Sequence, residues 1–113
     1  MNNYLVLFRE GDGREDVHSE EEIRKHRASW KSWFEEWSGK DRIAGGSGLT
    51  LNGRLIDANR GVVDGIHHNG KEIVGGFLIL KAGSLDEAAG IARSCPIYEF
   101  DGYSEVREMQ NPA

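Results

Sequence analysis

The stretch Ile73-Val74-Gly75-Gly76-Phe77-Leu78-Ile79-Leu80 is the most apolar part of the chain, and the expected fold is built around it. Its last four residues are apolar without alternation, which is typical of a central strand that is covered on both faces. A buried helix has a similar composition, but the Gly75-Gly76 pair favours a strand. Residues 3–9 form a second run whose apolar side chains point to both faces. We therefore expect a sheet with two apolar faces.

Two helices are predicted from capping residues and from the spacing of apolar side chains. Ser19 and Glu22 form a capping box ahead of an aromatic stripe at helical spacing, and Gly39 is expected to close this helix in the left-handed conformation. The stripe consists of Ile23, Trp30, Phe34 and Trp37. Ser84 and Glu87 repeat the capping signal ahead of a short, alanine-rich helix, which ends before a proline.

A hairpin is expected between the two helices. Residues 43–51 indicate a strand, Asn52-Gly53 a two-residue turn, and residues 54–59 the returning strand. A polar bend follows at residues 64–70, and the alternating residues 103–109 indicate a last strand. The predicted order is β-α-β-β-β-α-β.

This order predicts a single domain over residues 1–113, with an α+β fold of ferredoxin-like sandwich type. An antiparallel sheet then carries two helices on one face, so its second apolar face needs another cover. The simplest cover is a second copy of the same sheet, because monomers rarely leave several hundred Å² of contiguous apolar surface in water. We therefore expect a homodimer through the sheet face.

The composition restricts the class of partner. Among 113 residues, 14 are Lys or Arg and 19 are Asp or Glu, which gives a net charge of −5 and disfavours nucleic acid. No apolar run approaches the roughly 20 residues that a membrane span needs. Cys95 is the single cysteine, so we expect a reducing compartment, the cytoplasm, and no intrachain disulfide.

Several short motifs, taken in order, resemble the signature of the YCII-related, or DGPF-domain, family. They are Asp64-Gly65, Lys71-Glu72 and Gly75-Gly76-Phe77, where Ile66 and His67 replace the Pro and Phe of the signature. The resemblance covers nearly the whole chain and implies a dimeric α+β barrel of small cytoplasmic proteins, mostly without assigned biochemistry. Some members carry a His-Asp pair in a cleft. The corresponding helix position falls near Ser29-Trp30 here, so that pair is not expected in this chain.

The polar bend carries the candidate catalytic residues. An imidazole beside a carboxylate is a suitable general base, and Asp64 with His67 is the preferred pair. The alternative is a solvated polar turn, because Asp-Gly and Asn-Gly are strong turn formers. Asp57, Arg60 and Lys71 are further candidates for holding a polar or anionic ligand.

The long helix adds two candidates for ligand binding. Core packing is expected for its tryptophans, but Trp33 lies off the main stripe and is a candidate to face a cleft. His26 lies one turn before Trp30 and can reach the same cleft. No metal is expected, because the adjacent His67 and His68 point to opposite sides of an extended chain and no spaced Cys or His motif supplies further ligands. No cofactor is expected either.

These observations lead to two hypotheses for the function. The first is a small protein that binds a small organic ligand in a cleft between the sheet, the long helix and the dimer mate, with acid–base chemistry of isomerase or lyase type. The alternative is a non-catalytic interaction or regulatory module that acts as a homodimer.

Overall fold

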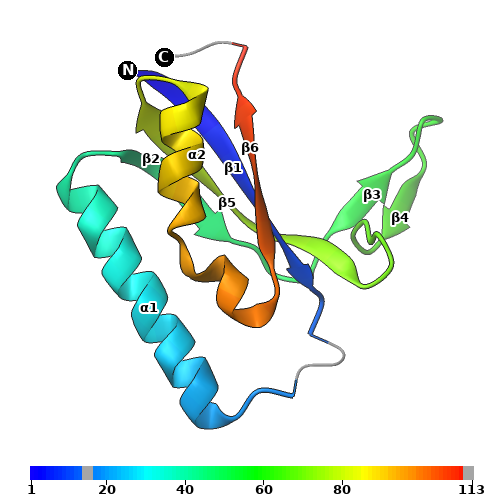
Figure 1. The fold of residues 1–113 in the computed structure, drawn as a ribbon. Coiled ribbons are helices and arrows are strands. Elements are labelled where there is room, and N and C mark those ends of the chain that lie inside the picture. Colours follow the sequence, from blue (N-terminus) through cyan, green and yellow to red (C-terminus); the bar gives the residue numbers. More distant parts are fainter. Residues whose placement is uncertain (14–16, 111–113) are drawn as a thin grey trace.

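The computed structural model describes residues 1–13 and 17–110, which form a four-stranded antiparallel sheet, two helices and a separate two-stranded hairpin (Figure 1). The strand order in the sheet is β2-β5-β1-β6, and the hairpin consists of β3 and β4. The predicted α+β fold of ferredoxin-like type is confirmed. The elements are β1 (Asn2–Gly11), α1 (Glu20–Gly39), β2 (Ile43–Gly48), β3 (Arg54–Ile56), β4 (Val62–Asp64), β5 (Glu72–Ala82), α2 (Leu85–Arg93), the 3₁₀-helix η1 (Pro96–Phe100) and β6 (Tyr103–Glu108).

Both helices pack on the same face of the sheet. Val6 of β1 and Leu78 and Leu80 of β5 are fully buried there, in one cluster with Trp33 of α1 and Ile91 of α2. The opposite face carries alternate residues of the same strands, and these stay half-buried because no helix covers them. They include Leu5, Leu7, Phe77 and Ile79, which are cross-strand neighbours.

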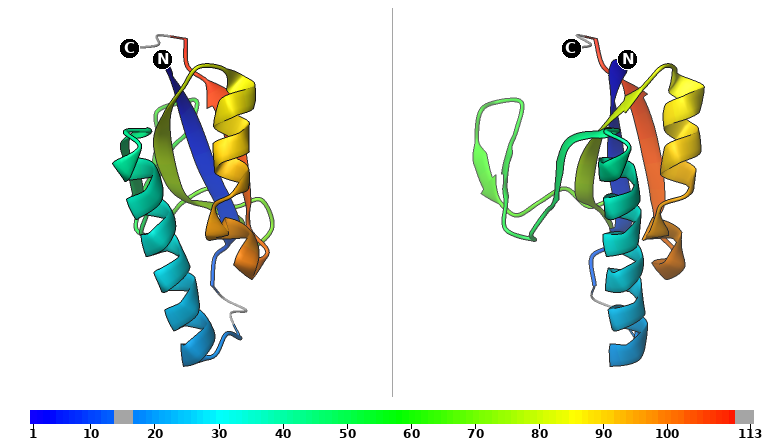
Figure 2. Two further views of the ribbon diagram at one scale, coloured as in Figure 1. Left: turned by 60° about the vertical axis from the view of Figure 1, so that its left-hand side comes forward. Right: turned by 90° about the vertical axis from the view of Figure 1, so that its left-hand side faces the viewer.

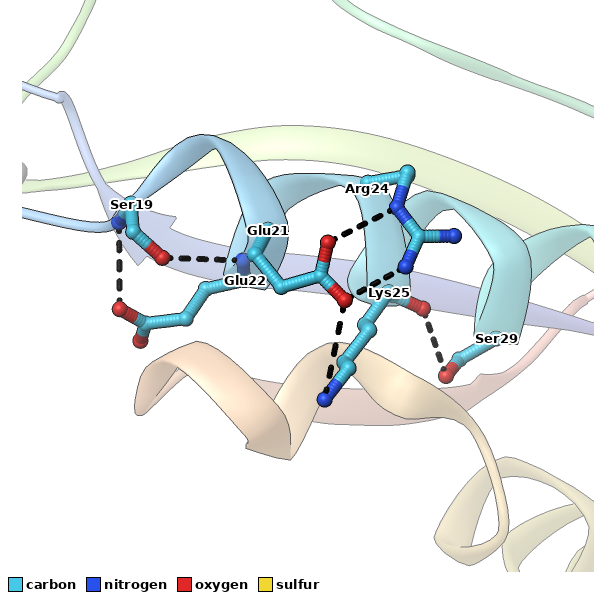
Figure 3. A network of polar contacts seen from close by, with 6 residues as sticks. All are labelled: Ser19, Glu21, Glu22, Arg24, Lys25 and Ser29. Atoms are coloured by element: carbon cyan, nitrogen blue, oxygen red, sulfur yellow. Dashed lines mark hydrogen bonds and ion pairs between the residues drawn. The ribbon is translucent and has the colours of Figure 1, made fainter.

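Helix α1 begins as predicted. The Ser19 hydroxyl accepts a bond from the Glu22 amide and the Glu22 carboxylate accepts one from the Ser19 amide, both at 3.1 Å (Figure 3). Arg24 then binds Glu21 through its Nε at 3.0 Å. The helix ends at Gly39 as predicted, but the expected left-handed conformation of Gly39 is wrong. That residue is still helical, and Asp41, whose carboxylate accepts a bond from a lysine of β5, takes the left-handed conformation with φ 57°.

Helix α2 has the predicted N-cap, since the Ser84 hydroxyl accepts a bond from the Glu87 amide at 3.1 Å. The Glu87 carboxylate forms an ion pair with Arg42, which follows α1. The chain ends α2 before Pro96, as predicted, and Pro96 then opens the 3₁₀-helix η1. This short helix packs against α1.

The hairpin differs from the prediction. Asn52-Gly53 does not join two paired strands, because β2 pairs with β5 and then leaves the sheet, while β3 pairs with β4. The hairpin turn is formed instead around Asp57, whose Oδ1 accepts bonds from the amides of Asn59 at 2.9 Å and Gly61 at 2.8 Å. The hairpin stands clear of the sheet on the side opposite α2 (Figure 2).

Among the described residues, no helix is both long enough and apolar enough to cross a bilayer.

Candidate functional site

A cleft of about 830 Å³ lies between the open face of the sheet and the segments that lead into and out of the hairpin. We call it the polar cleft, because charged and hydrogen-bonding side chains from three strands line one wall. The opposite wall is formed by the chain before β3 and after β4. The polar cleft is lined by Arg9, Leu49, Thr50, Asn52, Ile66, His67, Asn69, Glu72, Ile73, Val74, Tyr103, Ser104 and Glu105.

A β-bulge in β5 sets which side chains reach this cleft. Phe8 lies opposite Gly76, but the next residue of β1, Arg9, lies opposite Val74, so Gly75 is the extra residue. Strict alternation from Phe77 would place Gly75 and Ile73 on the open face. The bulge instead pairs Val74 with Arg9, so Val74 and Glu72 share the face of Arg9, while Ile73, which is 6% exposed, is paired with Glu10 and shares its face.

Two polar pairs dominate the wall of strands. The Arg9 guanidinium donates two bonds to Oε1 of Glu105, from Nε at 3.1 Å and from Nη2 at 3.0 Å. This contact lowers the pKa of Glu105 and raises the pKa of Arg9. A hydrogen bond to the Glu72 carboxylate, followed by burial, raises the pKa of Tyr103. The Tyr103 phenol therefore stays a proton donor at neutral pH.

His67 is the one predicted site residue that lines the polar cleft. Asp64, its predicted partner, accepts a bond from Nη1 of Arg54 at 2.7 Å and is strongly exposed on the hairpin. The carboxylates that share the cleft with His67 are those of Glu72 and Glu105. The orienting role of Asp64 stays a prediction.

A different histidine contacts an aspartate. Nε2 of His68 lies 3.3 Å from Oδ2 of Asp12, whose side chain is 6% exposed, and Nδ1 of His68 lies 3.1 Å from the Ile66 carbonyl. The Asp12 amide also donates to the Lys71 carbonyl at 2.9 Å. These contacts fix residues 66–71 against the end of β1. Reasoning from the sequence missed this pair, because nothing local links the end of the first strand to the polar bend.

The remaining candidates lie apart from the polar cleft. Asp57 and Arg60 belong to the hairpin turn, where Arg60 has φ 68°. Lys71 lines a different cavity of about 290 Å³. Trp33 is 6% exposed in the core and donates from Nε1 to the Ser94 hydroxyl at 2.9 Å. His26 lies on the helix face that packs against η1.

His26 has a defined set of partners. Its Nδ1 lies 2.8 Å from Oε1 of Glu99, and its Nε2 accepts a bond from Nε1 of Trp30 at 3.0 Å. Its ring stacks on Phe100 with centroids 4.2 Å apart. These contacts fix the His26 ring between α1 and η1. Over residues 1–13 and 17–110, no group of three or more His, Cys, Asp or Glu side chains is arranged to hold a metal ion.

Comparison with known proteins identifies both family and fold. The family model of the YCII-related domain matches residues 4–110. No match is found among the curated proteins. Among solved structures, the chain is similar to 5-chloro-2-hydroxyhydroquinone dehydrochlorinase from Burkholderia phenoliruptrix AC1100, in complex with 2,5-dihydroxybenzoquinone. The TM-score is 0.51 at 20% identity, over 96% of this chain and 94% of the other, so the likeness concerns the fold.

Proposed function

The chain belongs to the family of YCII-related domains, and on this premise we propose that it binds a small organic ligand in the polar cleft and transfers a proton there. One observation carries the proposal, which is the convergence of an imidazole, a guanidinium, a phenol and two carboxylates on one concavity of about 830 Å³. Sites of this size with a few convergent polar groups are typical of small-molecule binding.

The chemistry follows from the protonation of these groups. The imidazole of His67 acts as the base that removes a proton from carbon next to a carbonyl group. The single phenolic proton of Tyr103 is donated to Glu72. The carbonyl oxygen therefore receives its hydrogen bond, as negative charge develops on it, from an N–H group of Arg9 beyond the two that bind Glu105. Arg9 holds an anionic group of the ligand. This is acid–base chemistry of isomerase or lyase type.

A homodimer through the sheet face is part of the proposal, because a second copy would cover the open side of the cleft. The open face keeps half-buried apolar residues, and the hairpin exposes two cross-strand pairs, Leu55 with Val63 and Ile56 with Val62. Ile56 is 70% exposed and Val62 68%. The radius of gyration of 15.5 Å also exceeds the value of about 13 Å expected for a compact chain of this length.

Two measurements test the proposal. Isothermal titration with 2,5-dihydroxybenzoquinone, the ligand of the structurally similar dehydrochlorinase, reports binding. Deuterium uptake from heavy water into the methylene group of 2-oxobutyrate, followed by NMR, reports proton abstraction. Arg9→Ala should weaken binding, whereas Arg60→Ala, which removes an arginine of the hairpin turn, should not. His67→Ala should abolish deuterium uptake. Equal effects of the two arginine variants, or uptake that survives His67→Ala, would contradict the assignment.

The alternative is a non-catalytic interaction module that acts as a homodimer, and the exposed aliphatic side chains of the hairpin support it. The two functions make different predictions for the same preparation. A stable dimer that neither binds the quinone nor exchanges deuterium favours the interaction module. Saturable binding that depends on Arg9 favours the ligand-binding function.

A further inference from the structure

A second cavity of about 240 Å³ lies on the other side of the same β-bulge, between α1 and the helix-facing side of the sheet. We call it the apolar pocket, and we infer that it binds a single planar aromatic ring that carries a hydroxyl group, that is, a phenol. The inference is independent of the function proposed for the polar cleft. The residues that line the apolar pocket are Phe8, Glu10, Trp30, Phe34, Ser47, Gly48, Gly75, Gly76, Phe77 and Ile97.

The floor of the pocket is backbone without side chains, since Gly48 of β2 lies opposite Gly76 of β5. Neither glycine has a positive φ, so backbone conformation does not explain them. At Gly76, an added Cβ would lie 3.0 Å from the Ser47 carbonyl oxygen, so close packing accounts for that glycine. At Gly48, an added Cβ would meet nothing within 4 Å. The space above Gly48 is therefore left open by the sequence without a conformational or packing reason.

The walls are aromatic. The rings of Phe8 and Trp30 meet edge to face with centroids 5.2 Å apart, and those of Trp30 and Phe34 are tilted by 30° at 5.6 Å. Aromatic rings prefer such partners at centroid separations of about 4.5–7 Å, so an inserted ring finds suitable neighbours. A cavity of about 150 Å³ already holds benzene, and drug-sized ligands occupy about 300 Å³ or more. The volume therefore fits one ring.

The polar atoms at the pocket are acceptors. The Glu10 side chain lies against the Gly75 backbone, in the space where a Cβ of that residue would stand. A carboxylate accepts about four hydrogen bonds, so Glu10 can receive a ligand hydroxyl in addition to its protein partner. Ser47 is paired with Phe77, whose side chain is on the open face, so Ser47 contributes backbone to the pocket and Glu10 is the side-chain acceptor. A ring that donates a hydrogen bond fits this arrangement better than a bare hydrocarbon.

Trp30 is held in place from outside the pocket. Its indole nitrogen donates to His26, which does not line the pocket and is itself bound to Glu99. The indole therefore offers the ligand its ring, while its N–H group is engaged elsewhere. A ligand hydroxyl is left to Glu10. Binding of a ring against Trp30 should also change the fluorescence of that residue.

The experiment is a titration with phenol and with toluene, which has the same shape but no hydroxyl group, followed by tryptophan fluorescence and thermal shift. Phenol should saturate, raise the melting temperature and bind at least about tenfold more tightly than toluene, because a hydrogen bond to a carboxylate is worth about that factor. Glu10→Gln should reduce this preference. No saturable binding of phenol at millimolar concentration would overturn the inference.

Matched variants locate the ligand. Gly48→Leu fills the open space and should abolish phenol binding, whereas Gly45→Leu places the same side chain in open space on the same strand, outside the pocket, and should not. Phe34→Ala removes a partly exposed wall residue and should weaken binding severalfold, which keeps the test valid if Gly48→Leu does not fold. His67→Ala, in the polar cleft, should leave phenol binding unchanged. Equal losses in the two glycine variants, or no loss in Phe34→Ala, would place the ligand elsewhere.

Discussion

The indole nitrogen of Trp30 donates a hydrogen bond to Nε2 of His26 at 3.0 Å, one helical turn away, and His26 in turn contacts Glu99 of η1 at 2.8 Å. Because Nε2 must be unprotonated to accept this bond, the imidazole of His26 is held as an acceptor toward Trp30 and a donor toward Glu99. The contact links the long helix to the C-terminal part of the chain.

Removing this acceptor should lower stability. His26→Ala leaves the Trp30 indole N–H without its partner and removes the stacking on Phe100, so we expect a loss of about 1–2 kcal/mol in the free energy of unfolding. Urea denaturation followed by tryptophan fluorescence measures it. His26→Gln, which retains an acceptor, should lose less. Lys31→Ala, on the exposed side of the same helix, should change stability by less than about 0.5 kcal/mol. Equal losses for His26→Ala and His26→Gln would contradict the role of the hydrogen bond.

The ion pair between Arg9 and Glu105 should make stability depend on pH. The pKa of Glu105 is lowered in the folded state, so the pair contributes stability above the unfolded-state pKa, and this contribution is lost as the pH falls through the folded value. Glu105→Gln should therefore destabilise the protein at neutral pH and much less at about pH 3, below the ordinary glutamate pKa of about 4.3. Glu108→Gln, on the same strand, is the control. A pH-independent effect of Glu105→Gln would show that the charge of this residue is not what matters.

The exposed aliphatic residues of the hairpin should maintain the proposed dimer. Val62→Ser places a hydroxyl in the proposed interface, so we expect the variant dimer to dissociate at a higher protein concentration than the dimer of the unmodified chain. Light scattering after size-exclusion chromatography measures this. Val17→Ser changes a residue that is 88% exposed at a distance from the hairpin, and it should have no such effect. A monomeric unmodified chain at micromolar concentration would refute the dimer.

The single cysteine should be chemically inert in the folded protein. Burial raises the pKa of the Cys95 thiol, so little of the reactive thiolate forms near neutral pH, and the core also blocks access to it. Alkylation by iodoacetamide should be slow in buffer and fast in urea, with a rate that follows the unfolded fraction. The reaction of the fully unfolded chain gives the reference rate. Rapid modification under native conditions would mean that the region around α2 opens locally.

Local signals in the sequence were sufficient for most of the fold. The apolar run at residues 73–80 and the capping residues Ser19 and Ser84 act over a few neighbours, and the elements they predict are present. Asn52-Gly53 is also a strong local signal, yet it did not decide the pairing, because β2 gains its hydrogen bonds from β5 instead. Long-range pairing of this kind is set by the sheet as a whole.

The candidate site was less predictable for the same reason. His67 could be proposed from the polar bend and it lines the polar cleft, but its role stays a prediction. Arg9, Tyr103 and Glu105 come from strands that only the folded sheet brings together. Trp33 is the most deeply buried tryptophan, although the aromatic stripe predicted that Trp30 and Trp37 would be the buried ones. Helix α1 packs against α2 and η1 as well as the sheet, so the direction of its buried face depends on elements that follow it in the chain.

Because Gly75 is an extra residue in β5, it determines which residues of that strand face each side of the sheet. Both cavities depend on this alternation. Deleting this one residue while keeping the rest of the strand in register would exchange the inner and outer positions of residues 72–74. Ile73 would turn to the open face, and Glu72 and Val74 would turn to the face of Glu10, so Glu72 would leave the polar cleft and its hydrogen bond with Tyr103. This segment is therefore expected to tolerate replacement of side chains far better than insertion or deletion of a residue.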